Sequence, residues 1–175
     1  MNNQSGVSMI ELVLVIIIIV LITTFSIYTG NVALEQASAT EVFTEMNSIM
    51  EGVNSVNMKR SISEQDFDFD SYLGQIYDKK IEDITKGDLE AYMGISLTDA
   101  EFEMMKGSYI IFGMDRMDDY KNSNVRKYYG FDSIKHSYIV DFDNVKVDLL
   151  KSLKLSKQTV RTYGQVRALV EEGEI

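Results

Sequence analysis

An uninterrupted apolar run near the N-terminus constrains this chain more than any other feature of its sequence. Residues 12–22 read LVLVIIIIVLI, which is eleven apolar side chains in a row. The apolar character extends to Val7 and Ile27, interrupted only by Ser8, Glu11 and three hydroxyl residues. A helix over these 21 residues would be about 31 Å long, close to the thickness of a bilayer core. In lipid only a helix satisfies its own backbone, so the run predicts a membrane-spanning helix despite its β-branched side chains.

Three interpretations of this segment compete. A conventional signal peptide fits a short apolar run, but residues 1–6 carry no Lys or Arg and no small-residue cleavage site follows Ile22. A plain single-span anchor leaves Glu11 unexplained, because a carboxylate within an apolar span is unfavourable and usually has a partner. The third interpretation accounts for Glu11 together with Gly6, five positions upstream.

Residues 6–12, GVSMIEL, followed by the apolar run, resemble the class III signal of type IV prepilins. The resemblance covers residues 5 to about 28. It implies that a prepilin peptidase cuts after Gly6, methylates the new amine of Val7 and leaves the apolar helix in the mature chain. Glu11 then falls on the fifth mature position, which is usually glutamate in this family. The chain departs from the family in having no Lys or Arg just before Gly6 and no proline in the span.

The resemblance also implies a function. A carboxylate buried among apolar helices needs an opposite charge, and in a staggered stack the amine of Val7 on an adjacent subunit is available to Glu11. The implied protein is a type IV pilin subunit, a single-pass precursor in the cytoplasmic membrane that later enters an extracellular pilus. Its implied partners are itself and sibling pilins, the prepilin peptidase, an assembly ATPase acting through a membrane platform, and membrane lipid before assembly. A pseudopilin of a type II secretion or DNA-uptake system, and a single-span binding or sensor protein that never polymerises, are the alternatives.

Beyond residue 30 the pattern continues as an amphipathic helix. Apolar side chains recur at steps of three and four: Ala39, Val42, Phe43, Met46, Ile49, Met50, Val53 and Val56. We expect one helix from about residue 7 to 58, whose second half packs on a domain. The sequence therefore divides into a leader (1–6), an apolar transmembrane and assembly helix (7–29) and a globular headgroup (30–175).

The headgroup begins, after the long helix, with a polar and glycine-punctuated irregular region over residues 61–106. Two short helices are predicted in it. The first covers residues 86–93 and precedes Gly94, and the second is opened by a capping box of Thr98 and Glu101 and runs to about Lys106.

Strand signals follow this region. Strands are predicted over residues 108–114, 137–142 and 145–149, with a weaker candidate over 128–134. Asp143-Asn144 is predicted to form a two-residue hairpin turn. A last helix from residue 162 to about 172 is opened by a capping box of Thr162 and Gln165. The predicted fold is α+β, with a small antiparallel sheet packed against the second half of the long helix, as in pilins.

Composition excludes several function classes. The chain has no cysteine, so disulfides, thiolate metal sites and thiol nucleophiles are absent. A net charge of −10 makes the chain a poor match for nucleic acid. The single histidine, His136, does not allow a His-rich metal site, and no nucleophile or phosphate-loop motif accompanies it. We therefore expect no catalytic, cofactor-binding or metal-binding residues.

Charge is unevenly distributed along the chain. Residues 61–105 hold twelve acidic and three basic side chains, whereas residues 145–170 hold six basic and one acidic. These runs predict either two solvated faces of one domain or unlike faces that meet between subunits. Asp66, Asp68 and Asp70 imitate the start of a calcium loop, but the glycine and glutamate such a loop needs do not follow, so an exposed acidic segment is favoured.

Overall fold

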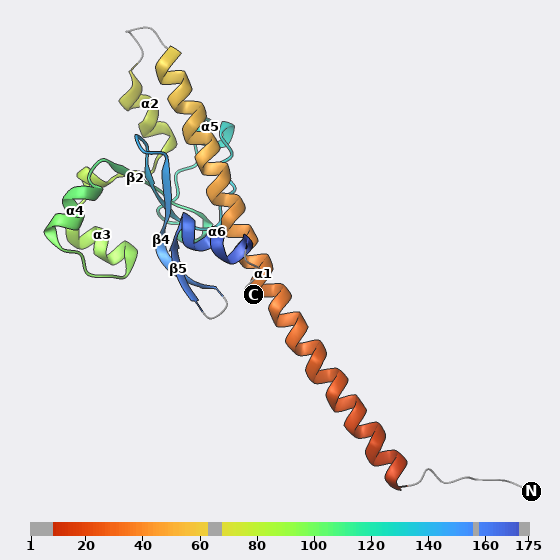
Figure 1. The fold of residues 1–175 in the computed structure, drawn as a ribbon. Coiled ribbons are helices and arrows are strands. Elements are labelled where there is room, and N and C mark those ends of the chain that lie inside the picture. Colours follow the sequence, from red (N-terminus) through yellow and green to blue (C-terminus); the bar gives the residue numbers. More distant parts are fainter. Residues whose placement is uncertain (1–8, 63–67, 156–157, 172–175) are drawn as a thin grey trace, which may run out of the picture.

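One long helix organises the molecule. A computed structural model describes residues 9–62, 68–155 and 158–171, and the side chains in these ranges except those of residues 9–12, 27–32 and 69. Helix α1 (Met9–Ile62) contains 54 residues and is therefore about 81 Å long. Its first half projects away from the rest of the molecule, and its second half lies along the sheet (Figure 1). The predicted continuous helix is confirmed.

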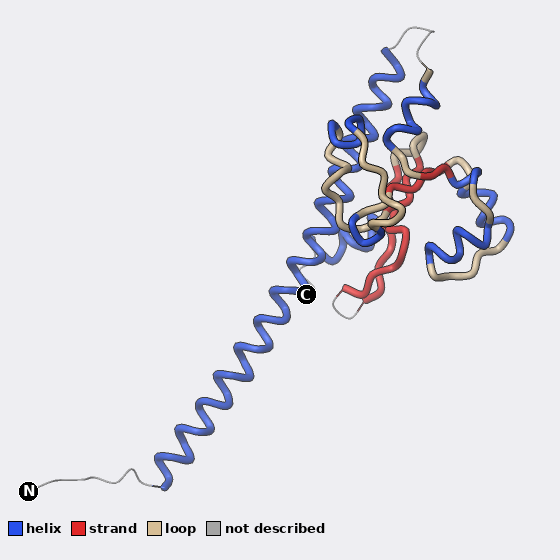
Figure 2. The backbone as a smooth tube through the Cα atoms, turned by 180° about the vertical axis from the view of Figure 1, so that it is seen from behind, coloured by secondary structure: helices blue, strands red, loops and turns tan. Residues whose placement is uncertain are grey.

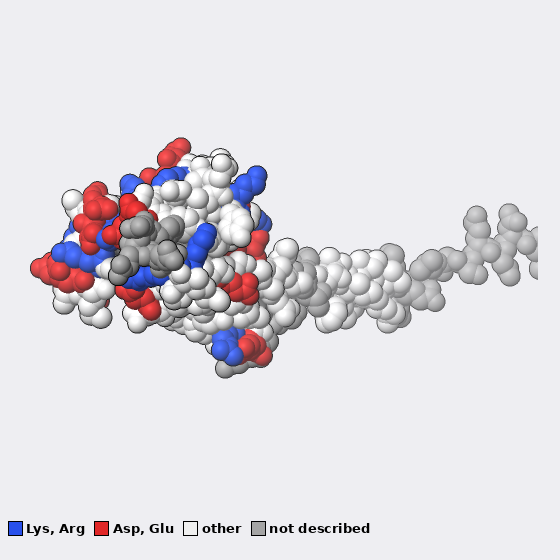
Figure 3. Space-filling model, turned by 90° about the horizontal axis from the view of Figure 1, so that it is seen from above, with Lys and Arg blue, Asp and Glu red and all other residues white. Residues whose placement is uncertain are grey.

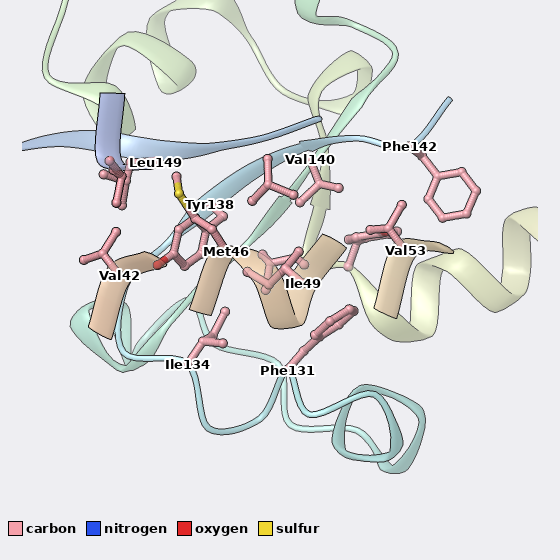
Figure 4. Close-up of a cluster of buried hydrophobic side chains, with 14 of the residues drawn as sticks. Val42, Met46, Ile49, Val53, Phe131, Ile134, Tyr138, Val140, Phe142 and Leu149 are labelled. Carbon is pink, nitrogen blue, oxygen red and sulfur yellow. The ribbon is translucent and has the colours of Figure 1, made fainter. Parts of the chain in front are cut away.

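The second half of α1 carries the predicted apolar stripe. Six side chains of this stripe are at most 1% exposed: Ala39, Val42, Met46, Ile49, Val53 and Val56. Their spacing of three and four residues places them on one face of the helix. Figure 4 shows this face packed against Tyr138, Val140 and Leu149 of the sheet. The sheet and α1 therefore share one hydrophobic core.

The sheet has five antiparallel strands in chain order: β1 (Lys79–Lys80), β2 (Ser108–Ile111), β3 (Tyr138–Asp141), β4 (Lys146–Leu155) and β5 (Gln158–Thr162). Helix α6 (Tyr163–Glu171) follows β5 directly and packs beside α1 through buried Val166 and Leu169. The α+β class and the antiparallel sheet are thus confirmed.

The opposite face of the sheet is also covered. Successive residues of the strands alternate between two cores, with Ile111 facing α1 and Ile110 facing the other side. On that other side lie the short 3₁₀ helix Ile81–Asp83, α3 (Lys86–Met93) and α4 (Asp99–Met105), as Figure 2 shows from behind. The two helices predicted within residues 61–106 are therefore confirmed, but residues 81–105 are not irregular and fold as a third layer.

Helix ends follow the predicted signals. Helix α3 ends at Gly94, whose φ of +70° is the left-handed conformation that glycine adopts without strain. Thr98 accepts a hydrogen bond from the Glu101 N–H, and the Glu101 side chain accepts one from the Thr98 N–H, which confirms the capping box of α4. Gln165 accepts from the Thr162 N–H at 3.0 Å in the same way at the start of α6.

One predicted strand, over residues 108–114, is shorter than expected, and another prediction is wrong. Strand β2 ends at Ile111 because the next two N–H groups bond to side chains: Phe112 donates to Asp78 Oδ2 at 2.6 Å and Gly113 to Ser137 Oγ at 3.0 Å. The weak strand candidate over residues 128–134 is instead the end of α5 (Asn124–Tyr128) followed by turns. The remaining short elements are α2 (Phe69–Ile76) and the 3₁₀ helix Met114–Arg116.

The predicted two-residue hairpin turn is wrong as well. Asp141 pairs with Lys146, so four residues connect β3 to β4. The Asn144 N–H donates to Asp141 Oδ1 at 3.1 Å, and Val145 adopts a φ of +51°. This side-chain hydrogen bond stabilises the longer turn. Strand β4 continues past the predicted residue 149 to Leu155, and β5 follows it. This continuation and β5 lie in a basic run for which the sequence predicted no strand.

Candidate assembly surface

The first half of α1 presents apolar side chains in every direction. Each large apolar side chain from Val13 to Ile22, and Phe25 beyond them, is between 45% and 69% exposed. Because any four consecutive residues surround a helix, this segment has no polar face to turn toward water. No charged residue interrupts it, and it is white where it projects from the headgroup in Figure 3. An apolar surface of this extent marks a site of association with a partner or a lipid phase.

The hydroxyl residues of this segment do not make it polar. Thr23, Thr24 and Ser26 donate to the carbonyl oxygens four residues earlier, at 2.7, 2.8 and 2.9 Å. Their hydrogen-bonding capacity is therefore largely satisfied inside the helix. The sequence suggested that these residues interrupt the apolar run, but in the helix their hydroxyl groups are hydrogen-bonded to backbone carbonyl oxygens.

The predicted processing and assembly residues lie at the edge of the structure or beyond it. Gly6 and Val7 are outside the described residues. Glu11 lies in the first turn of α1, but its side chain is also outside the described part, so its pairing with a neighbouring Val7 amine stays a prediction. Among the described residues, no helix has a stretch both long and apolar enough to span a membrane.

The second half of α1 has an open face opposite the sheet. Two neighbouring hollows follow it, and Ser133 lines both. The first, of about 690 Å³, lies over residues 33–45, and the second, of about 810 Å³, lies over residues 48–62. Half of the α1 residues along these hollows are small: Ala33, Ala37, Thr40, Thr44, Ser48, Gly52 and Ser55. Small side chains allow a second helix to approach closely.

Gly52 also shows how closely the headgroup approaches α1. A Cβ atom at this position would overlap the ring of Phe131, which packs against the helix from the segment after α5. The ring is fully buried beside Ile49 and Val53 (Figure 4). Gly52 is therefore needed for the fit of the headgroup onto α1.

A polar cluster fastens α1 to the sheet where the helix enters the headgroup. Glu45 of α1 accepts hydrogen bonds from the Lys135 N–H at 2.7 Å and from Tyr138 Oη at 2.6 Å. His136 Nδ1 lies 3.0 Å from Glu45 Oε2, and Lys135 forms an ion pair with Glu41. Burial raises the pKa of Glu45, but the hydrogen bonds from His136, Tyr138 and Lys135 outweigh it and leave the pKa below its ordinary value.

A buried ion pair joins the connecting segments of the headgroup. Arg126 of α5 is fully buried and paired with Asp78, whose side chain is 2% exposed. Arg126 also donates to the carbonyl oxygens of Phe112 and, at 2.9 Å from Nε, Phe131. Its guanidinium lies 4.2 Å from the centre of the Tyr120 ring. These contacts join three connecting segments and satisfy both charges.

The charged runs of the sequence do not form two separate faces. Asp78 of the acidic run is buried, and Asp68 caps α2 by accepting from the Ser71 N–H at 3.1 Å. In the basic run, Lys154 lies on β4 and Arg167 on α6, against α1. Figure 3 shows acidic and basic atoms interspersed on the face of the headgroup in view. Asp66 of the calcium-like triad is outside the described residues, and within the described ones no three His, Cys, Asp or Glu side chains are grouped to bind a metal.

Sequence reasoning missed the open face of α1, the Glu45 cluster and the Arg126–Asp78 pair. Only the first left a signal, since small residues recur at helical spacing from Ala33 to Ser55. The Glu45 cluster joins residues about 90 positions apart, and Arg126 and Asp78 are 48 positions apart, so no local pattern connects either set. Comparison of the chain with protein-family models, curated proteins and solved structures found no match.

Proposed function

We propose that this chain is a type IV pilin-like subunit, processed after Gly6 and polymerised through α1 into an extracellular pilus. Before assembly it is a single-pass precursor in the cytoplasmic membrane. One observation supports this proposal most strongly: an uncharged apolar helical segment, exposed on all sides, continues without a break into a helix held in a folded headgroup. A subunit built this way buries its projecting segment only in lipid or among other helices.

The membrane and the filament are related environments for this segment. The described apolar stretch of residues 13–26 is about 21 Å long, and the sequence continues its apolar character through Leu12 and Ile27. Because lipid tails and neighbouring apolar helices solvate these side chains similarly, transfer into the filament gains little hydrophobic free energy. Close packing and specific polar pairs must then determine whether the segment stays in the membrane or enters the filament, and in which register. The pair of Glu11 with the Val7 amine of an adjacent subunit is proposed for that role.

The open face of α1 is the proposed docking site for a neighbour's apolar segment. Its small side chains allow close helix packing, and the hollows over residues 33–62 supply the space. The centres of residues 13–26 and of residues 33–62 are about 28 positions apart on α1, which corresponds to about 42 Å. Parallel subunits shifted by this distance along a filament bring the two surfaces together, so this neighbour is a different subunit from the one whose Val7 amine pairs with Glu11.

The register pair is tested with Glu11→Ala. Loss of the carboxylate leaves the Val7 amine unpaired in an apolar environment, so we expect processing to continue but filaments to fall by about 100-fold or more. Glu35→Ala is the matched control, since Glu35 is an exposed α1 carboxylate outside the apolar segment. Normal filament yield from a processed Glu11→Ala subunit would refute the pairing.

The docking site is tested by cross-linking, because the chain has no cysteine of its own. Mixed filaments of Val20→Cys and Ser48→Cys subunits, whose positions are 28 residues apart, are expected to form disulfide-linked dimers under mild oxidation. Val20→Cys mixed with Lys154→Cys is the control, because Lys154 lies on β4 away from the open face of α1. Equal cross-linking in both mixtures would contradict the proposed docking face. Imaging of filament length separates a pilus from the short fibre of a pseudopilin.

A further inference from the structure

The only histidine of the chain lies at the junction between α1 and the sheet. His136 precedes β3, its side chain is 23% exposed, and its Nδ1 lies 3.0 Å from Oε2 of Glu45, which is 11% exposed. Histidine is the one side chain whose ordinary pKa lies between pH 5 and 8. A pH response of the headgroup in this range is therefore expected at the contact that holds α1.

The backbone on both sides of the imidazole is held by its neighbours. Gly113 packs so closely against the backbone of His136 that a Cβ atom on residue 113 would overlap the His136 carbonyl. The Met114 and Asp115 N–H groups donate to the carbonyl oxygens of Ile134 and Lys135, at 3.0 and 2.8 Å. The backbone that carries the ring is therefore held in a fixed position beside Glu45.

The charges around the ring are mostly negative. Glu45 and Glu41 face it from α1, and Asp115 faces it from the segment after β2, where it accepts from Ser137 Oγ at 2.7 Å. Lys135 is a cation beside them, and it is paired with Glu41. Tyr138 donates to Glu45 from β3. This surrounding favours the imidazolium over the neutral ring.

We propose that His136 and Glu45 form a pH-dependent latch, which holds the second half of α1 on the sheet more tightly when the imidazole is protonated. The inference does not depend on polymerisation, because it concerns the folded headgroup alone. When the ring loses its proton, the Nδ1–H tautomer can still donate to Glu45, so the latch loses its ion pair rather than its contact.

The expected pH window follows from both partners. The hydrogen bond to Glu45 raises the pKa of His136 above its ordinary 6.5, so the stabilisation is complete below pH 6.5 and is lost as pH rises through the folded-state pKa. The pKa of Glu45 is lowered from its ordinary 4.5, so its contribution is present above pH 4.5 and is lost as pH falls through the folded-state pKa. The latch is tightest between these two ordinary values.

The test uses the full chain in detergent micelles. Because there is one histidine, the imidazole C–H signals in a proton NMR titration belong to a single ring, and we expect its apparent pKa to lie above 6.5 and to fall in Glu45→Gln. Amide exchange of residues 42–49 is compared with that of His136→Gln at each pH, so that intrinsic exchange rates cancel. The wild type is expected to be protected up to about fivefold more at pH 5.5 and equally at pH 8.5.

Lys135→Gln is the matched control. It removes the exposed ion pair with Glu41 but leaves the latch, so it should keep the wild-type pH dependence. A wild-type imidazole pKa at or below 6.5 would overturn the proposal, even if His136→Gln fails to fold. So would a protection ratio that does not change with pH.

Discussion

The two halves of α1 share one continuous helical backbone but differ in how their apolar side chains are arranged. In residues 39–56 the buried side chains follow one face, and the sheet, α6 and the segment around Phe131 together cover that face. In residues 13–26 apolar side chains surround the helix, and nothing in the described structure covers them. Helical structure therefore does not distinguish the halves. The distribution of apolar side chains does, and it indicates that the first half is completed by contacts outside the subunit.

A charge placed in each half gives the largest effects. Met46→Lys buries an ammonium in the core, so we expect the headgroup to lose more than about 4 kcal/mol of unfolding free energy. Ile17→Lys, at a position 53% exposed, should leave headgroup stability within about 0.5 kcal/mol and abolish filaments. Denaturation curves and electron microscopy measure the two outcomes, with the membrane fraction assayed to separate storage from assembly. A loss of headgroup stability in Ile17→Lys would contradict the conclusion that the first half of α1 makes its contacts outside the subunit.

The next largest effect comes from the polar network of the headgroup. Arg126→Met leaves Asp78 buried without its cation, and we expect a loss of about 3–5 kcal/mol. The double variant Arg126→Met/Asp78→Asn should recover part of this loss, because it removes the unpaired charge. Chemical denaturation measures both. If Arg126→Met alone is as stable as the wild type, the ion pair does not stabilise the part of the headgroup that covers α1.

Gly52→Ala tests the fit between the covered half and Phe131. The added methyl group overlaps the buried ring, so we expect a loss of about 1–3 kcal/mol. Gly74→Ala in α2 is the matched control, since a Cβ atom there meets nothing within 4 Å and alanine favours a helix. Thermal unfolding compares the two. Equal melting temperatures of Gly52→Ala and Gly74→Ala would mean that Phe131 does not pack closely against α1 at residue 52.

The smallest effect is expected in the uncovered half. The Thr24 hydroxyl bonds to the Val20 carbonyl at 2.8 Å, so Thr24→Val removes no contact with a partner. Filament yield should be unchanged, whereas Thr24→Asp should reduce it strongly. A filament defect in Thr24→Val would show that this hydroxyl is used between subunits, and the surface would then be less uniformly apolar than we describe.

Local patterns in the sequence predicted what short-range physics determines. The stripe from Ala39 to Val56, the capping box of Thr98 and Glu101 and the left-handed Gly94 are all set by residues within a few positions of one another. Strand β5 was missed because its side chains alternate with only Val160 buried, so hydrophobicity gave little signal.

The rest depended on contacts between distant residues. Strand β2 ends early because Asp78, more than thirty positions away, accepts the Phe112 N–H. The third layer was missed because α3 and α4 each bury few side chains, and Leu89 and Met93 find their partners only on the assembled sheet. For the assembly site, the exposed apolar segment could be expected from residues 12–22, but the open face of α1 became evident only once the headgroup was in place.

The most direct test of assembly through a retained α1 is mass analysis of the mature N-terminus, on protein isolated from its native cell. The account predicts a chain that begins at Val7, with or without a methyl group on its amine, and that retains the whole apolar segment through Ile27. A mature chain that begins at Met1, or one that begins after Ile27, would contradict it.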